Sequence, residues 1–539
     1  MQKNKILLYI ISLFLLVAFA AYFSGLFIDV TRDAGKYATA AKEIYQNGNF
    51  INLTVHGEPY DQKPPLLFWL GAIGFSIGGV SNFWFKFPIF LLILAGFYWA
   101  FRLGESLYNR KIGIVTAILL FFSLIYSLYS MDIHTDTPLQ AFVTLALWQL
   151  FEFLKSGKNK NFILGFTAIG LAMLSKGPVG AAIPAFAVVG HIVLKKDFRQ
   201  FLDYRWYLGI VLSLLIVSPA LIGLMNQFGW NGIKFFFWEN MAGRITGSYV
   251  QAINDPIFYF HNLLYQLLPW SVLFYISVFF EFKTLIKRKL VAGEYFTLTG
   301  IWIYFIILNL ATSQLPNYVF AIVPLMAVLA SKWIIISTEQ LGKKYRIFFT
   351  TQNVIVASIW VLIFIIALYL FPFPKIYYWI IVFAGVTTTI YIYKTNLAPV
   401  IKLVAPSAIA FACFIFLMNT YAFPYIFSFQ APPKAARYFT ENAKEGEKLY
   451  NYKYGQYELF FYSEPQAALL HNFDEVKLVA GKKGNWIFTD DEGYQEIKKL
   501  GLNSEKILEF QHLYLNRGGK FIPPKTRENV LYPMYLIKY

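Results

Sequence analysis

Long apolar runs separated by short polar segments dominate the first 424 residues of the chain. A helix that spans a bilayer needs about 20 mostly apolar residues, so these runs predict about 13 spanning helices. They are expected near residues 6–28, 85–103, 113–131, 137–154, 161–175, 177–194, 206–225, 266–282, 295–311, 318–336, 350–371, 377–393 and 400–424. The hydrophobic pattern therefore predicts an α-helical polytopic membrane protein.

Two apolar runs need a further argument. The run at 6–28 could be a secretory signal, because Ala18-Phe19-Ala20 resembles a cleavage site, but it is longer than the apolar core of such signals. We therefore predict an uncleaved helix there. The run at 64–79 is short and contains four glycines, so its length alone does not decide whether it spans.

The distribution of basic residues decides the second case. If 64–79 does not span, 22 of the 31 Lys and Arg residues in the first 424 positions fall on the same side as the N-terminus. Basic residues concentrate on the cytoplasmic side of membrane proteins. We therefore predict a cytoplasmic N-terminus and a long outer loop at about 29–84, with a helix over 64–79 lying on the membrane surface.

Composition changes sharply near residue 424. Charged residues make up about 11% of 1–424 and about 26% of 425–539, and the second fraction is typical of soluble proteins. Strand-like and helical runs are mixed in this last part. We predict a transmembrane domain over 1–424 and a small soluble α/β domain over 425–539 on the outer, periplasmic side.

The composition of the whole chain excludes several other classes. Of the 539 residues, 57% are hydrophobic and 14% are charged, which rules out soluble globular, disordered and fibrous proteins. The single cysteine excludes a disulfide framework and a cysteine metal cluster. The net charge of +17 is explained mainly by membrane orientation, so no nucleic-acid partner is predicted.

The loop after the first predicted span carries charges on the outer side. Asp33 and Lys36 are three residues apart, so they share one face if a helix opens here. The alternative is that Asp33 simply caps the first amides of that helix.

A second outer turn places Asp132, His134 and Asp136 between two apolar spans. Ionisable groups at this depth are costly and indicate function. Two alternatives remain open. Asp136 could cap the following helix, with Pro138 in its first turn, or the three side chains could ligate a divalent metal.

Basic residues in the outer segments suit a lipid-linked phosphate, because its charge must be met where water is scarce. Lys176 lies between two apolar runs, where the alternative is a side chain that snorkels to the head groups. Arg244 lies in the aromatic-rich loop 226–265. With Lys36 and Lys63 they provide positive charge, and a nearby carboxylate could remove a proton from an acceptor hydroxyl.

Four short motifs occur in order on this face. Asp-x-x-(Arg/Lys)-Tyr-Ala begins at Asp33, Tyr-x-x-Lys-Pro-Pro-Leu at Tyr60, Thr-Asp-x-Pro-Leu at Thr135 and Leu-(Ser/Thr)-Lys-Gly-Pro at Leu174. Their order and spacing, over about residues 20–330, resemble those of the bacterial GT-C glycosyltransferases. These enzymes are relatives of the protein O-mannosyltransferases and of the 4-amino-4-deoxy-L-arabinose lipid A transferases.

The resemblance implies transfer of a sugar from a polyprenyl (undecaprenyl) phosphate donor to an envelope acceptor at the outer face of the cytoplasmic membrane. The acceptor would be a lipid A-like lipid, a glycan or a protein, and the transfer would invert the anomeric centre without a metal or other cofactor. The residues carried over are Asp33 as catalytic base or acceptor-orienting group, Asp136 as second acid, Tyr60, Lys63, Arg244 and Lys36 toward the donor phosphate, and Lys176 with its role open.

Two positions depart from the usual motifs of these enzymes. Ala34 follows Asp33 where an acid is common, and Gln62 precedes Lys63 where a glutamate is common. Without that carboxylate, Lys63 is freer to bind phosphate. The change also leaves open any metal or acceptor role of the missing glutamate, and with it the identity of the acceptor.

Two other functions are alternatives to a glycosyltransferase. A transporter of a lipid or small solute would also have a dozen or so spans, but it needs charges along a path through the membrane. Here the charged residues that indicate function lie in the predicted outer loops, and no clear inverted repeat is visible. A scaffold that binds partners through 425–539 would leave the four motifs unexplained.

Overall fold

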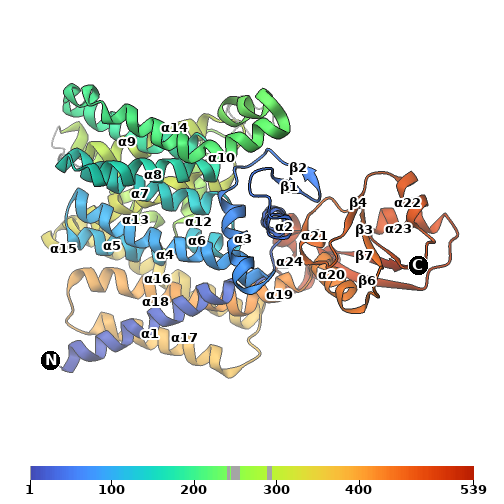
Figure 1. The fold of residues 1–539 in the computed structure, drawn as a ribbon. Coiled ribbons are helices and arrows are strands. Elements are labelled where there is room, and N and C mark those ends of the chain that lie inside the picture. The colour runs from blue at the N-terminus through green and yellow to red at the C-terminus, as the bar shows by residue number, and fades with distance from the viewer. Residues whose placement is uncertain (1, 240–242, 244–254, 288–293) are drawn as a thin grey trace.

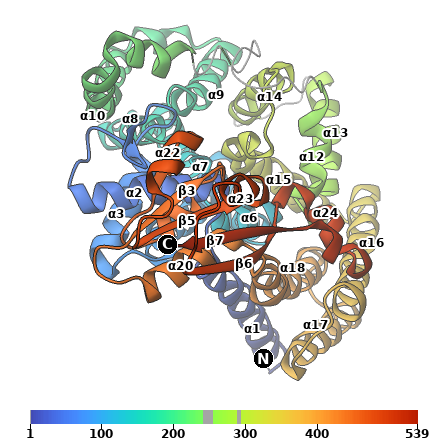
Figure 2. The ribbon, with the colours of Figure 1, turned by 90° about the vertical axis from the view of Figure 1, so that its right-hand side faces the viewer.

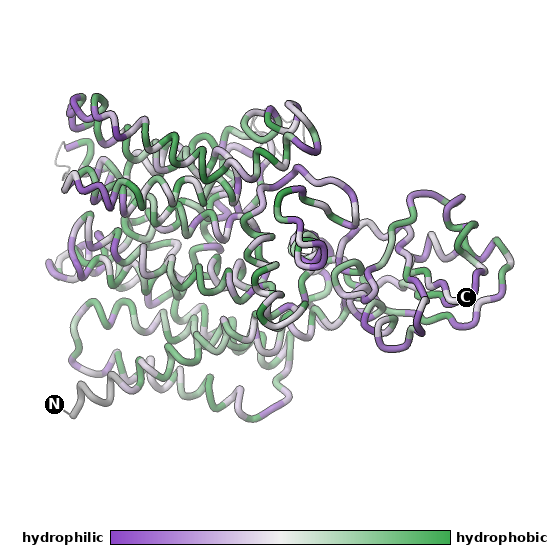
Figure 3. Tube along the Cα trace, in the orientation of Figure 1, coloured by the Kyte–Doolittle hydropathy of each residue, from purple (hydrophilic) through white to green (hydrophobic). Residues whose placement is uncertain are grey.

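The helices of the apolar part of the chain form one bundle, and the C-terminal segment forms a separate unit at one end of it (Figure 1). The computed structural model describes residues 2–239, 243, 255–287 and 294–539. The N-terminus lies at the opposite end of the bundle from the C-terminal unit. Hydrophobic residues follow the long helices, whereas hydrophilic residues gather at helix ends and in the C-terminal unit (Figure 3). The bundle thus has the polarity of a membrane domain.

The helices of the bundle and their connections follow the predicted order of apolar runs. They are α1 (Gln2–Gly25), α4 (Asn82–Leu107), α5 (Arg110–Phe121), α6 (Leu124–Met131), α7 (Asp136–Ser156), α8 (Asn159–Lys176), α9 (Val179–Lys195), η1 (Phe198–Leu202), α10 (Arg205–Lys234), η2 (Phe235–Glu239), α12 (Phe258–Gln266), α13 (Ser271–Ile286), α14 (Glu294–Leu310), η3 (Pro316–Ile322), α15 (Val323–Gln340), α16 (Lys343–Ile365), η4 (Ile366–Leu370), α17 (Ile376–Lys394), α18 (Pro399–Leu417), η5 (Met418–Ala422) and α19 (Phe423–Phe427).

Length and apolarity identify fewer spans than the hydrophobic pattern predicts. Within the described residues, six helices can cross a membrane by these two criteria, or seven if α5 and α6, which are bent by 52°, form one span. Shorter apolar helices, including Tyr9–Gly25 in α1, fall below the length needed. The chain is therefore a multi-pass protein, and the total of 13 spans stays a prediction.

The predicted outer loop forms a small layer between the bundle and the C-terminal unit. It contains α2 (Arg32–Asn47), the antiparallel pair β1 (Thr54–Val55) and β2 (Glu58–Pro59), and α3 (Leu66–Gly78). With 13 residues, α3 is about 20 Å long, too short to span, and it runs across the ends of the other helices (Figure 1). Its glycines allow close packing on α4, since a Cβ at Gly74 would lie 1.8 Å from the Trp84 carbonyl oxygen.

The C-terminal unit contains a five-stranded sheet with the order β4-β3-β5-β7-β6. β3 is parallel to β4 and β5, and β7 is antiparallel to β5 and β6. Its elements are α20 (Ala431–Asn442), β3 (Lys448–Tyr452), α21 (Glu458–Tyr462), β4 (Ala468–Leu470), α22 (Phe473–Val479), β5 (Asn485–Asp490), α23 (Asp491–Lys498), β6 (Lys506–Leu513), η6 (Leu515–Arg517), α24 (Gly518–Phe521), η7 (Pro524–Thr526), η8 (Glu528–Val530) and β7 (Leu531–Lys538).

Helices cover both faces of this sheet because its central strands are apolar on both sides. Trp486 and Phe488 of β5 pack in one cluster with Phe439 of α20, whereas Ile487 packs in another with Ile497 of α23, as the alternation of side chains along a strand requires. Figure 2 looks onto this unit, which lies over the end of the bundle. It therefore covers the same end of the molecule as α2 and α3.

Candidate active site

The first turn of α2 carries the acid of the first motif. The side chain of Asp33 is 51% exposed, and its carboxylate lies 3.7 Å from the Lys36 ammonium. The side chain of the N-cap residue Thr31 makes no capping hydrogen bond to α2. The backbone N–H of Arg32 instead donates to the Glu458 carboxylate of the C-terminal unit. The capping alternative for Asp33 therefore loses its support, and its carboxylate faces solvent.

Asp136 is buried at the start of α7 and is held by two side chains from distant helices. One carboxylate oxygen lies 2.5 Å from the Lys176 ammonium, and the other accepts a hydrogen bond from the Asn317 amide at 2.7 Å. The side chain of Asp136 is 2% exposed. Both oxygens are thus engaged by side chains rather than by the first amides of α7, which is not what a helix cap does.

Lys176 is largely buried among other side chains, with 11% of its side chain exposed. Besides its ion pair with Asp136, its ammonium lies 4.0 Å from the centre of the Tyr318 ring. Tyr304 donates a hydrogen bond to the carbonyl of Tyr318. The end of α8, the start of α7 and η3 therefore meet at one cluster of polar groups.

Asp132 and His134 form a second pair in the turn before α7. The His134 ring nitrogen lies 3.2 Å from the Asp132 carboxylate. Across the described part of the chain, no group of three or more His, Cys, Asp or Glu side chains is arranged to hold a metal ion. These residues therefore give no structural support to the metal alternative.

The acids around His134 control its charge. Burial alone would lower the pKa of His134, but the carboxylates of Asp132, Asp33 and Asp136 outweigh burial and raise it. The pKa of Asp132 is lowered, because His134 and other cations outweigh its burial. The nearby acids therefore favour the protonated form of His134.

We expect His134→Gln to reduce the melting temperature more at about pH 5.5 than at about pH 9. Because folding raises the pKa of His134 above its usual 6.5, the folded state binds the proton more tightly. This stabilisation is complete below the unfolded pKa and is lost as the pH rises through the folded pKa. Thermal unfolding in detergent measures it, with the exposed His471→Gln as control. Equal losses at both pH values would show that the proton is not involved.

Tyr37 links the two motif acids. It is 3% exposed, with its ring 5.7 Å from Phe68 and 6.3 Å from His134. Burial raises the pKa of Tyr37, and Asp33, Tyr60 and Asp136 raise it further, which places all three within electrostatic reach. Sequence reasoning included Tyr37 in a motif but weighed only the charged positions.

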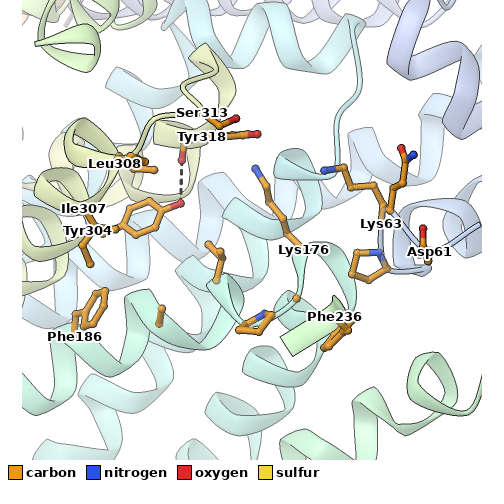
Figure 4. A pocket seen from close by; sticks show the side chains of 17 residues that line it. Asp61, Lys63, Lys176, Phe186, Phe236, Tyr304, Ile307, Leu308, Ser313 and Tyr318 are labelled. Atoms are coloured by element: carbon orange, nitrogen blue, oxygen red, sulfur yellow. Dashed lines mark hydrogen bonds between the residues drawn. The ribbon is translucent and has the colours of Figure 1, made fainter. Parts of the chain in front are cut away.

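A cavity opens beside this cluster and receives both Lys63 and Lys176 (Figure 4). It encloses about 1100 Å³, its open mouth included. One part of its wall is polar and the rest is apolar. The lining residues are Asp61, Gln62, Lys63, Pro64, Lys176, Gly177, Pro178, Val179, Ala182, Phe186, Phe236, Tyr304, Ile307, Leu308, Ala311, Ser313 and Tyr318.

This lining combines two cations with an extended apolar wall. The ammonium groups of Lys63 and Lys176 point into the same space, with Ser313 and Tyr318 above them and Phe236 below in Figure 4. Burial raises the pKa of Asp61 at the rim. Such a site fits an amphiphile with an anionic head, because the cations offset the head's charge and the apolar wall accepts hydrocarbon.

The structure places the remaining predicted residues in different positions. Tyr60 lines a smaller cavity that shares Lys63 and Phe236 with the first. Lys36 lies over the ring of Tyr457 of the C-terminal unit, 4.9 Å from its centre, and is not among the residues that line either cavity. Arg244 lies outside the described residues.

Asn317 and Tyr318 are site residues that sequence reasoning did not single out. Both belong to η3, within a segment that contributed to the family resemblance. They carry no charge and stand in an otherwise apolar stretch. In the sequence, they stand out only because they lie within the range over which the family resemblance extends. Their contacts with Asp136 and Lys176 reveal their position in the site.

The chain is similar to several known proteins. Residues 62–222 match the family of dolichyl-phosphate-mannose-protein mannosyltransferases. Undecaprenyl phosphate-alpha-4-amino-4-deoxy-L-arabinose arabinosyl transferase 2 of Proteus mirabilis is 25% identical over 56% of this chain and 54% of its own length. A protein of uncharacterised function from Aquifex aeolicus is 23% identical over 84% of this chain and 86% of its own length.

A solved structure shares the fold over nearly the whole chain. ArnT from Cupriavidus metallidurans, crystallised with undecaprenyl phosphate, aligns with a TM-score of 0.73 at 16% identity, covering 98% of this chain and 97% of ArnT. In sequence, by contrast, the chain spans about half the length of the arabinosyl transferases it matches.

In fold and in the matched segments, the chain is similar to the membrane glycosyltransferases of the GT-C class. Within this class it resembles the ArnT arabinosyl transferases and the protein mannosyltransferases, so the resemblance predicted from the four motifs is confirmed. The matches favour this class over the transporter and the scaffold.

Proposed function

We propose that this chain transfers a sugar from a polyprenyl phosphate, such as undecaprenyl phosphate, to an envelope acceptor at the periplasmic face of a bacterial inner membrane. The observation that carries the proposal is the cavity in which Lys63 and Lys176 meet an apolar wall. The ArnT structure with undecaprenyl phosphate and the arabinosyl transferase relatives support this choice of donor. A lipid A-like lipid, a glycan and a protein all remain candidate acceptors.

In the proposed reaction, an acceptor oxygen forms a bond to the anomeric carbon while the bond from that carbon to the phosphate oxygen breaks. Attack from the opposite side inverts the anomeric centre, and the phosphate leaves on its prenyl tail. Lys63, with Tyr60 and Arg244, offsets the charge that develops on the leaving phosphate. If the acceptor is a hydroxyl, Asp33 takes its proton.

The other predicted residues support this reaction in the proposal. Asp136, held by Lys176 and Asn317, orients the substrates as the second acid, and Lys176 also adds positive charge near the phosphate. Gln62 lines the same cavity. Lys36, which lies beside Asp33, adds positive charge toward the donor phosphate. If the acceptor is itself a phosphate, no base is needed and Asp33 orients donor or acceptor instead.

The proposal includes the predicted topology. The basic residues put the N-terminus in the cytoplasm, and thirteen spans would then put residues 425–539 in the periplasm. The domain boundary at 424 falls in α19, shortly before α20 opens with Pro432 and Pro433 in its first turn. Prolines fit that position because the first amides of a helix have no intrahelical partner.

Membranes that contain the chain, supplied with radiolabelled polyprenyl-phosphate sugars, test the proposal. We expect label to move from the lipid donor to one envelope fraction only when the chain is present. Membranes from cells without the chain are the control. The proposal fails if every donor leaves all envelope fractions equally labelled with and without the chain. Unchanged donor that appears on the other side of the vesicles would instead indicate transport.

A further inference from the structure

The N-terminus of α2 has an unusual backbone. Arg32, directly before Asp33, has φ 51°, in the left-handed region that side-chain-bearing residues seldom adopt. Thr31 at the N-cap position makes no side-chain hydrogen bond to the helix. The first turn of α2 therefore depends on a group from elsewhere to satisfy its amides and hold its conformation.

The C-terminal unit supplies that group. Glu458 is 1% exposed, and one of its oxygens accepts the hydrogen bond of the Arg32 N–H at 2.5 Å. The Tyr454 hydroxyl donates to the other oxygen at 3.1 Å. The N–H of Val30 donates to the Tyr462 hydroxyl at 2.7 Å. An acid at a helix N-terminus also interacts favourably with the helix dipole, so Glu458 caps α2 from a distant part of the chain.

A lysine of α2 makes a contact in the other direction, from α2 to the backbone of the C-terminal unit. The ammonium of Lys42, which is 1% exposed, donates to the carbonyls of Phe461 and Ser463 at 3.2 and 2.6 Å, at the end of α21. It also lies 3.3 Å from the Glu464 carboxylate. Each segment thus sends one buried charged side chain to the backbone of the other. We call Glu458 and Lys42 the clamp.

Packing between the two segments reinforces the clamp. Phe461 lies in the same core cluster as Tyr37 of α2, with its ring 6.1 Å from that of Phe75 in α3. A buried charge that loses its partner is strongly destabilised, so the two ends of the clamp resist separation. Contacts with the C-terminal unit therefore hold the first turn of α2 in place.

We propose that Glu458 and Lys42 are positioning residues, through which the C-terminal unit holds the first turn of α2, and with it Asp33, in the position that transfer requires. This inference rests on the proposed function and assigns a role to the C-terminal unit within the same site. Neither residue lines the cavity that holds Lys63 and Lys176. They set the direction of the Asp33 carboxylate and its distance from the reacting atoms. Transfer rates depend steeply on both.

Steady-state kinetics of the full-length reconstituted protein test the proposal. We expect Glu458→Leu and Lys42→Met to lower kcat by about 10- to 100-fold with a nearly unchanged KM for the polyprenyl-phosphate sugar, because the cavity is untouched. Glu458→Gln keeps an oxygen that can accept from Arg32 N–H, so it should retain most of kcat. Glu492→Leu is the control, since it removes an exposed acid of the same unit.

Amide hydrogen exchange separates this role from simple folding. In Glu458→Leu, exchange should accelerate in residues 30–36 while β3 and β5 keep their protection. Unchanged kcat and exchange in both clamp variants would overturn the proposal. Loss of protection throughout the sheet in both would also overturn it, because the contacts would then stabilise the unit rather than α2. The exchange result stands even if no donor supports transfer, so the two proposals can fail separately.

Discussion

Asp33→Asn is expected to lower kcat by about 10²- to 10⁴-fold when the acceptor is a hydroxyl, the usual range for the loss of a general base. Asparagine has nearly the same shape but cannot take the proton. Asp33 is half-exposed and caps no helix, so the variant should fold normally and bind the donor with an unchanged KM. The measurement is transfer of labelled sugar by the reconstituted protein at saturating donor.

The control and the contrary outcome are both informative for Asp33. Asp203→Asn removes a carboxylate that pairs with Arg205 before α10, and it should leave kcat unchanged. A loss of less than tenfold for Asp33→Asn would contradict the base role and favour a phosphate acceptor, which needs no deprotonation. Equal incorporation into every envelope fraction by wild type and variant would remove Asp33 from catalysis altogether.

Lys63→Met should lower kcat/KM by about 10²- to 10³-fold, the effect of removing one preorganised group that stabilises developing charge. Methionine keeps most of the apolar stem of lysine but removes the ammonium from the cavity wall. Lys176 is committed to Asp136 at 2.5 Å, so it compensates only in part. Lys63→Arg restores the charge and should recover much of the activity.

Binding of polyprenyl phosphate without a sugar gives a second measurement for Lys63. Affinity should fall in Lys63→Met, and the difference should shrink as salt screens the charge in the open mouth of the cavity. Lys160→Met, an exposed lysine at the start of α8, is the control for loss of a positive charge. Wild-type affinity in Lys63→Met would show that the phosphate binds elsewhere.

Several features of the protein follow from local sequence. The apolar runs predict where helices lie, because amide satisfaction in a bilayer requires helices of about 20 residues. The short glycine-containing run at 64–79 predicts a non-spanning helix, and α3 has that length. The change of composition near 424 predicts where a soluble domain begins. The order of the motifs also identified four candidate site residues: Asp33, Lys63, Asp136 and Lys176.

Local sequence patterns could not predict that these residues lie close together in the structure. Asp136 and Asn317 are 181 positions apart, and Arg32 and Glu458 are 426 apart. Spacing rules act over one or two helical turns, so no periodicity relates such pairs. The contact of Lys36 with Tyr457 also joins distant parts of the chain, and the role of Lys36 toward the phosphate stays a prediction.

The sequence by itself determined that this chain is a polytopic membrane protein and which glycosyltransferases it resembles, and it predicted which face carries the candidate chemistry. Only the tertiary structure decided that Lys63 and Lys176 share a cavity, that Asp136 is held by Asn317, and that Glu458 caps α2. The physical reason is that helix formation and membrane insertion depend on neighbouring residues. A binding site depends instead on how distant segments pack against one another.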